Sequence, residues 1–116
     1  MKNVRGARLN SEYQRELYDI ITNRVKDADI TEMVSVLRVE VTPDLKHAKV
    51  WLSVYSKDEE KRQKTYRAIE RAAGFIRHEL SLVMRQRTVP ELHFTLDDSM
   101  EYSDKINRLL NEIHKD

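Results

Sequence analysis

Basic side chains gather in one stretch of the sequence, between residues 61 and 87. This stretch holds eight Lys or Arg residues and two Glu residues, although the net charge of the 116-residue chain is only +1. Residues 88–116, by contrast, hold seven acidic and three basic residues. Clustered Lys and Arg side chains attract polyanions, so the stretch indicates nucleic-acid binding. An ordinary solvated helix face explains the charge alone equally well.

The spacing of these charges predicts a basic ridge on a helix. With about 100° of rotation per residue, Lys64, Arg67 and Arg71 lie on one side of a helix. Tyr66 and Ile69 lie on the opposite side, where they can pack against a core. We therefore expect the basic ridge to face solvent.

Gly74 interrupts the helical pattern, and basic residues follow it as well. Arg77, Ser81 and Arg85 share one face of the second helical half. A break with arginines on both sides, a glycine at the corner and a free helix N-terminus suits a sugar-phosphate backbone. The alternative is a helical hairpin whose arginines pair with neighbouring glutamates such as Glu70.

Other chemistry finds little support in the sequence. The chain has two glycines and no cysteine, which excludes a phosphate-cradling glycine loop, a nucleophile elbow and a thiolate zinc site. His78-Glu79 lacks a second histidine four residues later, so we expect no metal and no other cofactor. The histidines are scattered along the chain, at His47, His78, His93 and His114. The pair Asp97-Asp98 allows a hydrolase hypothesis, but carboxylates at a helix start are better explained by the helix dipole.

The hydrophobic pattern predicts the elements that hold the ridge. Apolar residues recur every three or four positions over residues 9–26, which predicts a first helix. Ser56 and Glu59 fit a capping box, so a second helix is expected to begin near Lys57. It continues, with the break at Gly74, until Pro90. A last helix, capped by Ser99, is expected to close the chain.

Alternating apolar and polar residues predict three strands, over residues 34–42, 48–55 and 92–96. We expect Leu37, Val39 and Val41 to face the core together. The first two strands form a hairpin, and the long helical crossover lets the third pair in parallel. The fold class is therefore α+β, with a mixed sheet covered by helices on one face. Trp51 and Tyr55 are expected on the open face. The alternatives there are stacking on bases, a surface for a protein partner, which would make the chain a protein-interaction module, or cover for neighbouring side chains.

Three blocks of the sequence resemble the bacterial ribosome-binding factor A family. They are VEVTPDLKHAKVWLS at residues 39–53, AAGFIRHEL at 72–80, and RTVPELHF at 87–94 followed by Asp97-Asp98-Ser99. With the first helix and a closing helix around Lys105-Ile106, the resemblance covers nearly the whole chain. Asp27-Ala28-Asp29-Ile30 departs from the Asp-Pro turn of many members, which leaves the end of the first helix unspecified.

The resemblance implies a type II KH-like fold in which Ala72-Ala73-Gly74 replaces the usual Gly-x-x-Gly loop with a kink. It also implies binding to the free 30S subunit and its precursors, help with late 16S rRNA maturation near the 5′ end, and a role in the cold. We expect one domain over residues 1–116, flexible within residues 1–8, that is cytoplasmic, monomeric and not an enzyme. No membrane and no small-molecule substrate is expected. The residues expected to contact RNA are Lys64, Arg67, Arg71, Ala72, Ala73, Gly74, Arg77, Arg85, Arg87, Arg5 and Arg8.

Overall fold

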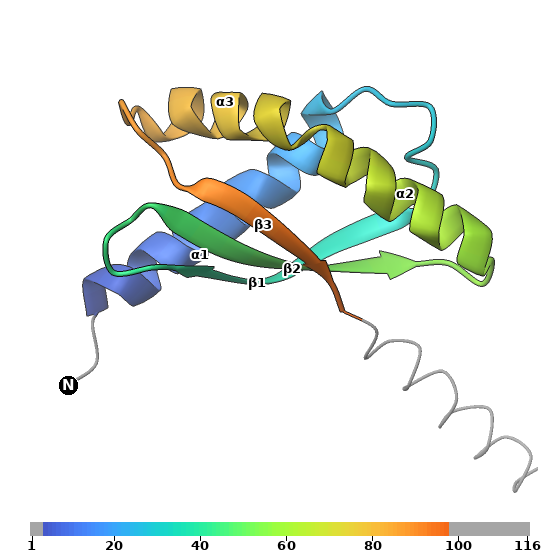
Figure 1. Cartoon of the computed structure of the whole chain (residues 1–116), viewed down its shortest axis with the longest axis horizontal. Helices are drawn as coiled ribbons and strands as arrows, with labels where there is room; N and C mark the ends of the chain where they lie inside the picture. The colour runs from blue at the N-terminus through green and yellow to red at the C-terminus, as the bar shows by residue number, and fades with distance from the viewer. Residues whose placement is uncertain (1–3, 98–116) are drawn as a thin grey trace, which may run out of the picture.

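Helices and strands alternate in the order that the sequence predicts. The computed structural model describes residues 4–97 (Figure 1). Its elements are α1 (Val4–Asp19), the π-helical turn η1 (Ile20–Arg24), β1 (Met33–Val41), β2 (His47–Tyr55), α2 (Glu59–Arg71), α3 (Ala73–Met84) and β3 (Glu91–Leu96). The predicted last helix lies outside the described residues. Within residues 4–97, no helix is long and apolar enough to cross a membrane.

The three strands form one mixed sheet in the order β1-β2-β3. β1 and β2 pair antiparallel as a hairpin, whereas β2 and β3 pair in parallel. A parallel pair needs a long connection, and α2 and α3 supply it. Figure 1 shows both of these helices on one side of the sheet. The α+β class and the mixed sheet covered on one face are therefore confirmed.

A β-bulge changes which residues of β1 face the core. The register with β2 shifts between Val36 and Arg38, so that one residue, Leu37, is inserted. Val36 and Val39 are both buried as a result, while Leu37 is 37% exposed. The prediction that Leu37 faces the core together with Val39 is therefore wrong. Strict alternation misplaces one residue wherever a bulge interrupts it.

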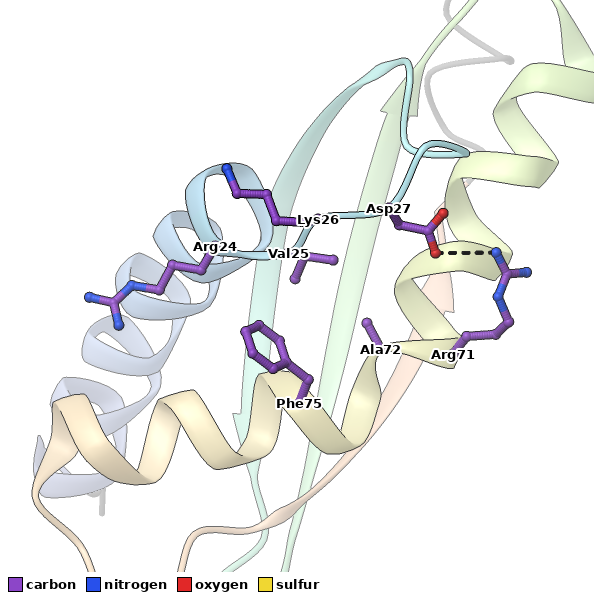
Figure 2. A pocket seen from close by; sticks show the side chains of 7 residues that line it. All are labelled: Arg24, Val25, Lys26, Asp27, Arg71, Ala72 and Phe75. Atoms are coloured by element: carbon purple, nitrogen blue, oxygen red, sulfur yellow. Dashed lines mark hydrogen bonds and ion pairs between the residues drawn. The ribbon is translucent and has the colours of Figure 1, made fainter.

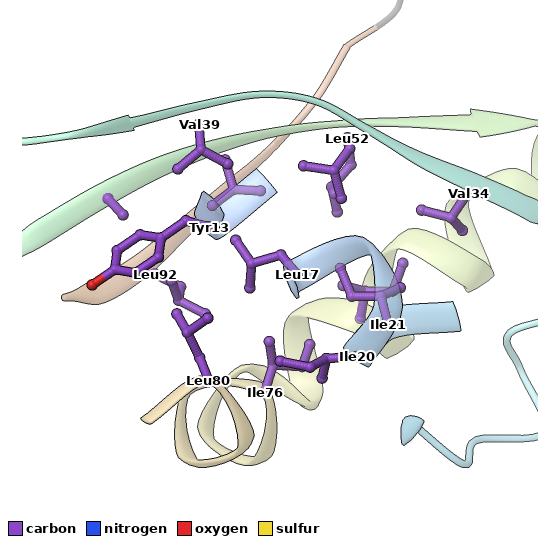
Figure 3. Packing of buried hydrophobic residues seen from close by; sticks show 14 of the residues in the cluster. Tyr13, Leu17, Ile20, Ile21, Val34, Val39, Leu52, Ile76, Leu80 and Leu92 are labelled. Carbon is purple, nitrogen blue, oxygen red and sulfur yellow. The ribbon is translucent and has the colours of Figure 1, made fainter. Parts of the chain in front are cut away.

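The core lies between the sheet and the helices (Figure 3). Along β2, Ala48, Val50, Leu52 and Val54 are buried, as the sequence predicts, and Ser53, which was expected on the opposite face, is buried as well. From the helices, the buried members of the same cluster are Tyr13, Leu17, Ile20, Ile21, Ile69, Ile76 and Leu80. Apolar residues of this size stabilise the fold by about 1.5–3 kcal/mol each when fully buried. The core thus fixes α3 against the end of α1.

Three helix ends differ from the prediction. Asp58, and not Ser56, caps α2, because its carboxylate accepts hydrogen bonds from the backbone N–H groups of Glu60 and Lys61 at 3.0 and 3.2 Å. The Ser56 hydroxyl instead accepts a hydrogen bond from the backbone N–H of Asp58. The first helical segment ends at Arg24, since the next residue has an extended backbone with φ −77° and ψ 121°. The same segment begins at Val4, before the start predicted at residue 9.

Candidate nucleic-acid interface

The basic ridge lies on the solvent side of α2. Thr65, Ala68 and Ile69 are fully buried on the opposite side of the helix. This burial turns Lys64 and Arg67 outward, and both are exposed. Within residues 4–97, neither side chain has an ion-pair or hydrogen-bond partner. Their charges are therefore available to an external anion.

The break between α2 and α3 falls at Ala72. Its φ of −86° and ψ of 6° interrupt the helix, and its N–H is shared between the carbonyl oxygens of Ala68 and Ile69. Gly74 lies inside α3, without a positive φ, and a Cβ built on it meets nothing within 4 Å. The kink predicted at Ala72-Ala73-Gly74 is present, but the glycine's conformational freedom is not what produces it.

No side chain caps the N-terminus of α3. Ala72 precedes this helix and has no polar side-chain atom, and the first turn contains no acidic residue. The first N–H groups of a helix lack acceptors within the helix and carry a partial positive charge. The start of α3 therefore adds donors and positive potential next to the basic ridge.

Arg71 is exposed but already paired. Its Nη2 lies 3.3 Å from a carboxylate oxygen of Asp27 and 3.1 Å from one of Asp29. The side chain is still 57% exposed, so a phosphate can approach it from solvent. The two aspartates hold the loop after η1 against the end of α2. Figure 2 shows the contact with Asp27. Arg71 thus contributes to both the fold and the basic surface.

Arg77 and Arg85 play different parts on α3. Both Nε and Nη2 of Arg77 donate hydrogen bonds to the backbone carbonyl of Val89, at 3.3 and 2.9 Å, which ties α3 to the segment before β3. Arg85 ends the helix in a left-handed conformation with φ 53°. Both residues are exposed, as predicted, as is Arg87. Of Arg67, Arg71, Arg77 and Arg85, none is buried in an internal ion pair.

An open groove lies between the end of the first helical segment and the kink. This Phe75 groove has a volume of about 290 Å³ and is lined by Arg24, Val25, Lys26, Asp27, Arg71, Ala72 and Phe75. Phe75 is 45% exposed. Figure 2 shows its ring reaching toward Val25, while Lys26 points away from the groove. Arg24, at the rim, is held by an ion pair with Glu79 of α3. An apolar floor with cations at its rim suits an unpaired base and its phosphate.

A second open groove lies on the other side of the α3 N-terminus. This His78 groove has a volume of about 280 Å³ and is lined by Gly74, Arg77, His78, Ser81, Arg87, Thr88 and Val89. Gly74 and Arg77 therefore lie in one groove with Arg87. Its lining is more polar than that of the Phe75 groove. It suits a sugar-phosphate backbone better than a base.

Three residues at these grooves were not predicted from the sequence as RNA contacts: Arg24, Lys26 and His78. Arg24 pairs with Glu79 of α3 at 2.9 Å, and this carboxylate raises the pKa of Arg24 above its usual range. That contact joins two segments far apart in the sequence. The spacing of residues along the sequence gives no sign of this ion pair.

Some residues that the sequence singled out lie away from the kink. Arg8 is exposed near the start of α1, which Figure 1 places at the opposite end of that helix from the α2–α3 junction. Arg5 also belongs to this start of α1. Arg8 therefore does not join the surface around the kink. Of the predicted acid pair, Asp97 follows β3, and its N–H donates to the carbonyl of Leu52; Asp98 lies outside the described residues.

Tyr66 fixes α2 over β3 beneath the ridge. Its hydroxyl donates a 2.9 Å hydrogen bond to the backbone carbonyl of Phe94. Burial, followed by the nearby Glu70 carboxylate, raises the pKa of Tyr66 to about 12. The phenol is therefore neutral at physiological pH and serves as a structural donor.

Comparison with known proteins identifies the family of the chain. The family model described as "Ribosome-binding factor A" matches residues 5–110. The chain belongs to the ribosome-binding factor A family. The protein of that name from Clostridium perfringens strain SM101 is 43% identical over 113 residues, 97% of each chain. The one from Clostridium beijerinckii is 42% identical over 115 residues, 99% of this chain and 98% of the relative.

Solved ribosome-binding factor A structures share the fold. The crystal structure of the Thermus thermophilus protein superposes with a TM-score of 0.66 at 24% identity, over 78% of this chain and 93% of that one. The solution NMR structure of a Thermotoga maritima protein gives a TM-score of 0.63 at 30% identity, over 82% and 90%. The type II KH-like fold expected from the family resemblance is thereby confirmed.

Proposed function

We propose that this protein is a small-subunit assembly factor that binds free 30S subunits and their precursors through the backbone of 16S rRNA. One relative supports this partner: coordinates of the Thermus thermophilus factor have been fitted into a map of a 30S complex, and their TM-score to this chain is 0.65. The observation that carries the proposal is the exposed positive charge on both sides of the kink, at Lys64, Arg67 and Arg87.

Three kinds of group at the kink would bind RNA together. Lys64 and Arg67 neutralise phosphates, because no internal carboxylate holds them within the described part of the chain. The uncapped start of α3 donates N–H groups to a phosphate oxygen. The exposed ring of Phe75 stacks on an unpaired base. These contacts depend on the charge and shape of the RNA more than on its base sequence, which suits a factor that recognises a folded RNA region.

The proposed role is to hold RNA, not to cut or modify it. We infer that the protein stabilises an immature conformation of 16S rRNA while its 5′ end is processed, and that it acts as a monomer. Misfolded RNA helices rearrange more slowly in the cold, so the need for such a factor is greatest at low temperature.

Sedimentation with purified 30S subunits tests the partner. We expect the wild-type protein to migrate with free 30S subunits, and Lys64→Glu/Arg67→Glu to remain near the top of the gradient. Lys49→Glu is the matched control, because Lys49 is also an exposed cation and lies on β2, away from the ridge on α2. If Lys49→Glu lost 30S binding to the same extent, or if Lys64→Glu/Arg67→Glu kept it, the ridge would not be part of the interface.

Complementation tests the cellular role. A strain lacking its own family member should accumulate 16S rRNA with unprocessed 5′ ends and grow poorly in the cold. Wild type and Lys49→Glu should restore both, whereas Lys64→Glu/Arg67→Glu should restore neither. Restoration by the ridge variant, at equal protein level, would contradict a role for this surface in maturation.

A protein-interaction module is the second candidate, because the open sheet face carries apolar side chains. Met33 is 71% exposed and Tyr55, its register partner, is 36% exposed. Trp51, however, is covered by the Arg38 guanidinium, 4.1 Å from the ring centroid, so it is not free to stack. Met33→Ser/Tyr55→Ser should leave 30S binding intact. Loss of binding in that variant alone would favour the module.

A further inference from the structure

Two histidines that are far apart in the sequence meet at the edge of the sheet where β2 begins. Nδ1 of His47 lies 2.9 Å from Nε2 of His93. Their ring centroids are 5.1 Å apart and the ring planes make an angle of 38°. His47 is the first residue of β2, and His93 lies in β3. Sequence spacing gives no sign of this pair.

The parallel register of β2 and β3 explains the pairing. His47 lies opposite Glu91, and Lys49 lies opposite His93. Alternate residues of a strand share a face, so His47, Glu91 and His93 project from the same face. Their neighbours Ala48 and Leu92 are buried in the core. The two histidines and the glutamate therefore lie on the open face, and all are exposed.

Glu91 brings a third donor atom to the histidines. Its Oε2 lies 3.7 Å from Nδ1 of His47, and the three donor atoms all lie within 4.8 Å of one another. Zn²⁺ binds nitrogen and carboxylate oxygen at about 2.0–2.2 Å with tetrahedral geometry, which puts ligand atoms about 3.3 Å apart. The observed separations of 2.9 and 3.7 Å lie on either side of that value. Small side-chain rotations would bring all three atoms onto one ion.

We propose that His47, Glu91 and His93 form a binding site for a zinc ion, with water completing the coordination. Two imidazoles and one carboxylate favour Zn²⁺ over Mg²⁺ or Ca²⁺, which prefer oxygen ligands. The ladder holds the site in place, since the N–H of Glu91 donates to the carbonyl of Lys46 at 2.9 Å. A bound ion would link the start of β2 to β3 and stabilise only the folded chain.

Calorimetry on the whole protein tests the site. We expect ZnCl₂ to bind the metal-free protein one to one, and MgCl₂ not to bind there. His47→Gln and His93→Gln should each weaken zinc binding by more than about tenfold, since even residues that only support metal ligands have effects of this size. Glu91→Gln should weaken it less. His78→Gln is the matched control, an exposed histidine on α3, and should bind zinc like the wild type.

Thermal melts and imidazole NMR signals provide independent readouts. Saturating zinc should raise the Tm of wild type and His78→Gln by several degrees and leave His47→Gln unchanged. The imidazole signals of His47 and His93 should shift together, and those of His78 should not. If the wild-type protein does not bind zinc one to one, the contact between His47 and His93 is only a hydrogen bond between two imidazoles. Zinc binding that survives His47→Gln would place the ion elsewhere, and either result overturns the proposal.

Discussion

Replacing Gly74 by alanine should make this protein more stable. Gly74 is the second residue of α3, has no positive φ, and has open space where a Cβ would be added. Alanine favours helix over glycine by about 1 kcal/mol in a helix interior, and its smaller unfolded-state entropy gives about 0.4–1 kcal/mol at compatible sites. Because Gly74 lies in the first helical turn, we expect about 0.5 kcal/mol or slightly more.

Thermal unfolding followed by circular dichroism measures this effect. For a domain of this size, a gain of 0.5–1 kcal/mol corresponds to a Tm rise of roughly 2–8 °C. Ala73→Gly is the matched control one residue earlier, and it should lower Tm by a similar amount. A lower Tm for Gly74→Ala would show that the glycine is required by the kink, and would refute the argument from its backbone and surroundings.

The same variant also tests how closely RNA approaches the kink. Gly74 lines the His78 groove, but its substitution changes no charge. We expect Gly74→Ala to bind 30S subunits with wild-type affinity. A variant that is more stable but binds more weakly would show that the RNA backbone contacts the glycine directly, which the basic ridge alone does not require.

Three further predictions concern the cap of α2, the paired Arg71 and the partly buried Tyr66. Asp58→Ala should lower the free energy of unfolding by about 0.5–2 kcal/mol in urea denaturation, because the start of α2 loses its cap; an unchanged midpoint would contradict this. Asp27→Asn/Asp29→Asn should tighten 30S binding by freeing Arg71, with little loss of stability because the pairs are partly exposed; weaker binding would mean that the aspartates mainly position the arginine. The raised pKa of Tyr66 means that the unfolded chain loses this proton first, so stability should fall as pH rises from about 10 to about 12. Tyr66→Phe should lack that part of the fall, and identical pH profiles would count against the shift.

Periodicity predicted most of the fold because the large apolar residues of β2 and of the helices follow the strand and helix periods. Alternate residues of β2 enter the core as expected, and the helical crossover allowed β3 to be placed in parallel. The side of the sheet on which Leu37 lies could not be predicted, because a bulge is a property of two paired strands. The cap of α2 was misplaced by two residues, since Ser56 and Asp58 are both good capping residues and only the chain path selects between them.

The candidate site was predictable where it depends on one helix and not where it depends on two segments. Helical spacing alone turns Lys64 and Arg67 to solvent. The pairing of Arg71 with Asp27 depends on how the loop after η1 packs against α2, which no local pattern encodes. The meeting of His47 with His93 likewise depends on the register of a parallel strand pair.

The salt dependence of 30S binding tests the central claim most directly. Each phosphate contact contributes about 0.7–0.9 to the slope of log K against log salt concentration. Lys64→Gln/Arg67→Gln should therefore bind more weakly and reduce the slope by about 1.4–1.8, whereas Lys49→Gln should leave both unchanged. A double variant that keeps the wild-type affinity and slope would contradict the claim that this ridge holds the RNA backbone.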